Sequence, residues 1–121
     1  MWNFKNLDVW KKSFEMIKKI YDVTGGFPRE EIYGLTSQLR RAVVSISSNI
    51  AEGCGRRTSK DFVGFLYNAL GSAKEVENQL LAAGELGYLE DGEVEDLVGE
   101  LNRIGRMLVG LIEHVSEKGI K

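Results

Sequence analysis

Residues 45–60, "SISSNIAEGCGRRTSK", contain the side chains of this chain with the most evident chemical potential. Cys54 is the single cysteine, and three cations, Arg56, Arg57 and Lys60, follow it within six residues. Neighbouring guanidinium groups favour a thiolate and also bind phosphate. The segment therefore leaves four alternatives open: a catalytic turn, a phosphate cradle, a nucleic-acid contact, or a tight corner between two helices.

Catalysis and nucleotide binding both require partners that the sequence does not supply. The "GCGRR" segment has neither the Gly-Lys-Ser/Thr ending nor the preceding strand of a nucleotide-binding loop. His114 is the only histidine and is predicted at the far end of the last helix, which disfavours a Cys-His or Ser-His pair. We therefore interpret Cys54 as a small residue in a turn and predict no catalytic residues and no enzymatic activity.

A metal site is also not expected. A di-iron helix bundle needs Glu-x-x-His on two helices, but Leu111 occupies the position three residues before His114. The sequence has no cluster of cysteine and histidine that could bind zinc. We predict neither a metal ion nor a cofactor.

The basic residues near the glycines form the remaining candidate ligand site. Five cations and only one acidic residue, Glu52, lie between residues 40 and 60. Guanidinium groups fit phosphate, and the start of the next helix offers free amides. Aromatic residues are not interleaved here, so RNA or DNA would be contacted mainly through phosphate, with strong salt dependence. The candidate nucleic-acid-binding residues are Arg40, Arg56, Arg57 and Lys60.

Apolar residues recur at alternating steps of three and four along four segments, which predicts an all-α protein. The first stripe is Leu7, Trp10, Phe14, Ile17 and Tyr21, and the second is Ile32, Leu35, Leu39, Ala42, Ile46 and Asn49. The third runs from Phe62 to Ala83 and the fourth from Val94 to Val115. Each stripe is expected to face the core.

Glycine, proline and capping residues predict the helix boundaries. Gly25 and Gly26 end the first helix, Pro28 opens the second, and Gly53 and Gly55 end it. Thr58 or Ser59 caps the third helix, and Asp91 caps the fourth. We predict helices at about 6–24, 29–52, 59–86 and 91–117 in a single domain, residues 1–121. Short connections favour an antiparallel, up-down-up-down four-helix bundle.

A polar seam is predicted between the second and third helices. If the chain folds back near residues 56 and 57, Ser45 faces Asn68, Arg41 faces Ser72, and Gln38 faces Glu75. Glycine and serine at 45, 48, 64, 71 and 72 would allow close backbones, and Arg41 could pair with Glu75 in a shielded place. We favour a structural polar network over an active site. Its members are Gln38, Arg41, Ser45, Asn49, Glu52, Asn68, Ser72 and Glu75.

Charge and composition limit the cellular setting. The net charge is −2, with 11 basic and 6 acidic residues in 1–60, against 5 and 12 in 61–121. This asymmetry fits two differently charged solvated faces, or a surface that pairs between subunits or steers an anionic partner. The sequence has no apolar run of about 20 residues and no signal-peptide pattern. We expect a cytoplasmic location and no membrane partner.

Residues 33–80 resemble the 23S rRNA intervening-sequence proteins, a family of four-helix bundle proteins. The most specific motifs are "QLRRA", "SNIAEG", "GR" followed by Ser-x-Asp-Phe, and "GSAKEVE". The opening "FKNLDVWKKSFEMIKKIY" and "FPREE" extend the resemblance over nearly the whole chain. The resemblance implies a bacterial-type cytoplasmic bundle that assembles into a homopentamer, with no catalytic activity attached to the family.

The same resemblance leaves two function hypotheses. The first is a non-enzymatic oligomeric protein that presents a surface to a macromolecular partner. The second follows a related branch, the accessory proteins of diversity-generating retroelements, which bind nucleic acid and a reverse transcriptase through a basic surface. The present chain departs from that branch in being mildly acidic.

Overall fold

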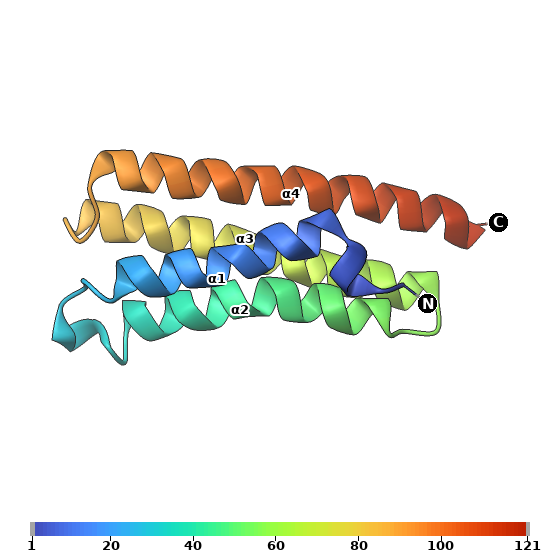
Figure 1. The fold of residues 1–121 in the computed structure, drawn as a ribbon, viewed down its shortest axis with the longest axis horizontal. Helices are drawn as coiled ribbons and strands as arrows, with labels where there is room; N and C mark the ends of the chain where they lie inside the picture. The colour runs from blue at the N-terminus through green and yellow to red at the C-terminus, as the bar shows by residue number, and fades with distance from the viewer. Residues whose placement is uncertain (1, 121) are drawn as a thin grey trace.

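The computed structural model describes residues 2–120, in which four long α-helices pack in sequence order. Successive helices run in opposite directions, and the short connections lie at alternating ends of the molecule (Figure 1). A one-turn 3-10 helix precedes the first helix and another precedes the second. The elements are η1 (Phe4–Asn6), α1 (Asp8–Thr24), η2 (Arg29–Glu31), α2 (Leu35–Cys54), α3 (Ser59–Glu85) and α4 (Asp91–Ile120).

Local capping explains where two of the helices begin. Thr58 Oγ1 accepts a hydrogen bond of 3.1 Å from the Asp61 amide, so Thr58 is the predicted N-cap of α3. The second helix begins at Leu35. The prediction that it begins at about residue 29 was wrong. Residues 29–31 form a 3-10 turn, and Gly34 has a non-helical backbone with φ −116° and ψ −116°. The carboxylate of Glu31 then accepts a 3.0 Å hydrogen bond from the Leu35 amide.

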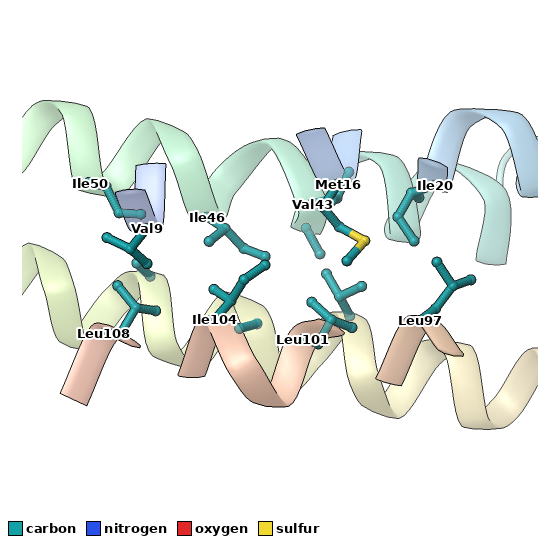
Figure 2. Packing of buried hydrophobic residues seen from close by; sticks show 14 of the residues in the cluster. Val9, Met16, Ile20, Val43, Ile46, Ile50, Leu97, Leu101, Ile104 and Leu108 are labelled. Carbon is teal, nitrogen blue, oxygen red and sulfur yellow. The ribbon is translucent and has the colours of Figure 1, made fainter. Parts of the chain in front are cut away.

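The core lies between the α1–α2 side and the α3–α4 side of the protein. Figure 2 shows Val9, Met16 and Ile20 of α1 pointing toward aliphatic side chains of α4. The predicted stripe of α3 is buried throughout, from Phe62 to Ala83. Burial of such side chains contributes about 25 cal/mol per Å² of apolar surface. The α2 and α4 members drawn beside them are Val43, Ile46, Ile50, Leu97, Leu101, Ile104 and Leu108.

The core face of α1 differs from the prediction. The fully buried residues are Val9, Ser13, Met16, Ile20 and Thr24. Of the predicted stripe, Leu7, Trp10 and Ile17 are partly buried and pack against the core, whereas Phe14 and Tyr21 are exposed. Two of the buried residues carry hydroxyls, and each donates a 2.7 Å hydrogen bond to a carbonyl one turn earlier. The hydroxyls are thereby satisfied within the helix, so they can face the core at low cost.

A membrane span needs about 20 mainly apolar residues in one helix. No helix within residues 2–120 meets that requirement.

Candidate functional site

The α2–α3 connection is a tight corner, and the close approach of the two helices there depends on one glycine. A Cβ on Gly53 would lie 2.8 Å from Phe62 Cδ1 and 2.9 Å from Phe65 Cβ. Only a residue without a side chain allows α2 to approach α3 at this point. A Cβ on Gly64 or Gly71, by contrast, would meet nothing within 4 Å. The prediction that these two glycines bring the helices together was therefore wrong.

Three cations lie at this corner, and they are not equivalent. Arg56 Nη2 donates to Glu52 Oε1 at 2.9 Å, and its guanidinium carbon lies 4.5 Å from the centroid of the Phe65 ring. Arg57 and Lys60 are exposed, and neither pairs with an acidic residue in the described part of the chain. The basic corner, defined here as Arg56, Arg57 and Lys60, therefore offers two free cations and one partly neutralised cation.

Arg40 does not belong to this corner. It precedes the end of α2 at Cys54 by 14 residues, about 21 Å along the helix. Its Nε donates to Thr24 Oγ1 at 2.9 Å, and its Nη2 donates to the Tyr21 carbonyl at 3.3 Å. The prediction that groups Arg40 with Arg56, Arg57 and Lys60 was wrong, because Arg40 joins α2 to the end of α1.

The α2–α3 seam contains a smaller polar network than predicted. Ser72 Oγ donates to Ser45 Oγ at 2.9 Å, which links the two helices. Asn49 Nδ2 donates to the Ser45 carbonyl at 2.9 Å and lies 3.0 Å from Ser45 Oγ. Ser45 thus bonds to Ser72 and not to Asn68, one turn further along α3 than expected. The structure brings together three of the eight predicted members.

The other five members lie on the surface. The prediction of a shielded pair between Arg41 and Glu75 was therefore wrong. Arg41 and Glu75 are exposed, and no described ion pair joins them. Glu52 bonds to Arg56, just beyond the end of α2, rather than facing Asp61. Gln38 and Asn68 are also exposed. Outward orientation on both helices keeps these polar groups hydrated, which costs less than burying them.

Cys54 has none of the properties of a reactive thiol. Its side chain is 2% exposed, and it is not part of a disulfide. Burial raises the pKa of the Cys54 thiol, so the neutral form predominates at neutral pH. Across residues 2–120, no three His, Cys, Asp or Glu side chains form a group that could hold a metal ion.

A row of aromatic side chains along the outside of α1 was not predicted as a surface. The Phe4 and Trp10 rings lie 5.0 Å apart, and Trp10 stacks on Phe14 at 4.8 Å between centroids. Phe14 is 54% exposed and Tyr21 is 42% exposed, whereas Phe4 and Trp10 are partly buried against the core. We call these four residues the aromatic face. The sequence signal for Trp10, Phe14 and Tyr21 was present in the predicted stripe, but that stripe was assigned to the core; Phe4 was not part of it.

Comparison with known proteins places the chain among proteins of the same architecture. Residues 5–110 match the family model described as 23S rRNA-intervening sequence protein. A crystal structure of a protein with unknown function from the S23 ribosomal protein family of Bacteroides thetaiotaomicron is similar, with a TM-score of 0.80 and 25% identity. The match covers 86% of this chain and 97% of that chain. Comparison with curated proteins gives no match.

Proposed function

Because the chain belongs to the 23S rRNA-intervening sequence protein family, we propose that it is a non-enzymatic protein that self-associates and presents a surface to a macromolecular partner. The observation that carries the self-association is the aromatic face. A single subunit leaves Phe14 and Tyr21 substantially exposed, next to a core that is already complete without them. Large apolar side chains grouped on one helix are typical of a contact surface.

Charge supports a second copy of the chain as the occupant of this face. Exposed lysines flank the aromatic face on α1, among them Lys11, which forms no described ion pair, and Lys18, which pairs with Asp22, whereas α4 carries exposed acidic residues. Glu95, Asp96 and Glu113 are examples. Two different surfaces of opposite charge favour a head-to-tail contact, and such contacts close into a ring where the rotation between subunits allows it. The homopentamer that the family resemblance implies is one such ring.

The replacement Phe14→Glu tests this proposal, with Tyr33→Glu as the matched control. Tyr33 is 97% exposed and lies in the connection between α1 and α2, outside the aromatic face. We expect light scattering to give an oligomeric mass for the wild type and for Tyr33→Glu, but a monomeric mass for Phe14→Glu with unchanged helicity. A monomeric wild type at micromolar concentration, or an intact oligomer in Phe14→Glu, would contradict the proposal.

The basic corner favours a second candidate function, binding of RNA or DNA through phosphate groups. Arg57 and Lys60 are exposed and unpaired within the described residues, and Thr58 caps the helix that begins beside them. In a ring of subunits, the positive electrostatic potentials of the basic corners would add to one another. The contacts would be mainly to phosphate, so binding should weaken steeply as salt rises.

A labelled oligonucleotide titrated at several salt concentrations tests this second function. We expect the double variant Arg57→Gln/Lys60→Gln to reduce both the affinity and the salt slope. The control Lys74→Gln/Arg103→Gln removes two exposed cations from α3 and α4 and should change binding much less. Equal binding by the two double variants would exclude the basic corner as the contact surface.

A further inference from the structure

A cavity of about 300 Å³ lies between the end of α1, the following connection and the first turns of α2. One part of its lining is polar and comes from Arg29, Thr36 and Arg40. The other part is apolar and comes from Phe27, Pro28 and Ile32. Ligand sites typically combine apolar walls with a few polar groups, and this volume is at the lower end of their range.

Arg40 is held in place before any ligand binds. Its Nε and Nη2 groups bond to Thr24 and to the Tyr21 carbonyl, and its guanidinium carbon lies 4.5 Å from the centroid of the Tyr21 ring. A guanidinium group has five N–H donors, so three remain without a partner among the described residues. A fixed guanidinium loses little entropy when it binds an anion.

Thr36 supplies a second polar group that has no protein partner. Its side chain is only 6% exposed and lines the cavity, and its hydroxyl makes no hydrogen bond within residues 2–117. Gln79 Oε1 is the only buried side-chain oxygen or nitrogen without a partner among the described residues, so the Thr36 hydroxyl is open to the space of the cavity. An oxygen acceptor in the cavity would satisfy it.

The charges around the cavity favour an anion. Arg29 is exposed and forms no ion pair among the described residues, and Arg40 bonds only to neutral groups. The nearby carboxylate of Glu31 is engaged through both oxygens, one by the Leu35 amide and the other by the Tyr88 hydroxyl. Glu30 is exposed at the same turn. The two guanidinium groups therefore provide positive charge that no bonded carboxylate cancels.

We propose that this cavity binds a small organic oxyanion, a carboxylate or a phosphate monoester with an apolar body. Arg40 and Thr36 bind the anionic oxygens, and Arg29 adds a second positive charge at the entrance. Phe27, Pro28 and Ile32 contact the apolar body of the ligand. Because Arg40 lies about 21 Å from the α2–α3 corner along the helix, this site is separate from the basic corner.

Titrations with phenyl phosphate, benzoate and inorganic phosphate, followed by nitrogen–proton correlation spectra, test the proposal. We expect saturable shifts at the Thr36 amide and the Arg40 side chain with at least one of the two aromatic anions. Preference for phenyl phosphate assigns the site to phosphate monoesters, and preference for benzoate assigns it to carboxylates. Inorganic phosphate alone should bind at least tenfold more weakly, because it lacks the apolar body.

Two conservative variants keep the test independent of folding. Thr36→Val keeps the side-chain shape and removes the hydroxyl, and Arg29→Gln changes an exposed side chain; each should weaken binding at least fivefold. Arg57→Gln, at the opposite end of α2, should bind like the wild type. The absence of saturable shifts with both aromatic anions at millimolar concentration would overturn the proposal. Unchanged affinity in both variants would overturn it as well, whatever the oligomeric mass.

Discussion

The Tyr88 hydroxyl donates a 2.9 Å hydrogen bond to Glu31 Oε2, across 57 residues of sequence. Glu31 Oε1 accepts at the same time from the Leu35 amide, so one carboxylate caps α2 and holds the α3–α4 connection against it. The Phe27 and Tyr88 rings lie 5.4 Å apart beside this bond. The two connections at this end of the molecule are thereby joined by one charged group and one aromatic pair.

Glu31 should make the stability of the protein depend on pH in the acid range. The Leu35 amide, and then the Tyr88 hydroxyl, lower the pKa of Glu31 below its ordinary value of 4.5. A lowered folded-state pKa contributes stability above the unfolded-state value, and this contribution is lost as pH falls through the folded-state value. We expect thermal melts to show a steeper loss of stability below pH 4.5 in the wild type than in Glu31→Gln.

Glu30→Gln is the matched control, because Glu30 is exposed and adjacent in sequence. It should keep the acid dependence of the wild type. Tyr88→Phe should reduce the dependence only in part, because the Leu35 amide still bonds to the carboxylate. If Glu31→Gln and Glu30→Gln gave the same pH profile, the cap would not contribute to stability in solution.

Gly53 and Gly71 should respond in opposite directions to the same replacement. In Gly53→Ala the new Cβ would meet Phe62 and Phe65 below 3.0 Å, and we expect a loss of about 1–3 kcal/mol of unfolding free energy. In Gly71→Ala the Cβ meets nothing within 4 Å, and the better helix propensity should add about 0.5–1 kcal/mol. Denaturant titrations measure both. Equal changes in unfolding free energy for the two variants would show that α2 and α3 can move apart at Gly53 without a loss of stability.

The sequence predicted the four helices well, but the core face of α1 is rotated relative to the predicted stripe, of which Leu7, Trp10 and Ile17 still pack against the core. Phe14 and Tyr21 have the spacing and the hydrophobicity of core residues but are exposed, whereas the fully buried face contains Ser13 and Thr24. Periodicity counts these two residues as polar, although their hydroxyls bond to carbonyls in their own helix. A helix with two apolar faces cannot be oriented from its own sequence, because the choice depends on the helices that pack beside it.

The candidate sites were predicted less well, because their partners come from other elements. Arg40 looked like one member of a cluster of cations, but it bonds to Thr24 and Tyr21 of another helix. The seam was recognised, but its register was one turn out, since Ser45 meets Ser72. The prediction assumed that residues equally far from the α2–α3 corner face each other. Side chains lean toward the start of their helix, so the contacts between two antiparallel helices are displaced from those positions.

The corrected seam predicts a small effect for Arg41 and a larger one for Ser45. Arg41→Ala should change the unfolding free energy by less than about 1 kcal/mol, because the side chain is exposed and unpaired within the described residues. Ser45→Ala removes the partner of Ser72 and a contact of Asn49, and should cost about 1 kcal/mol or more. A double-mutant cycle should show coupling for Ser45 with Ser72 but none for Arg41 with Glu75. Coupling between Arg41 and Glu75 would contradict the register of the structure.

Gln79 offers the chance to stabilise the protein by removing a polar group. Its side chain is 7% exposed, and Oε1 is buried without a hydrogen-bond partner in the described chain. A buried acceptor that has lost water and gained no donor opposes folding, whereas an apolar group of similar shape does not. Gln79→Met should therefore raise the unfolding free energy by about 1 kcal/mol in denaturant titrations at fixed protein concentration. Gln38→Met, on the exposed side of α2, should stay within about 0.5 kcal/mol of the wild type. A clear loss of stability in Gln79→Met would mean that Gln79 Oε1 accepts a hydrogen bond in solution.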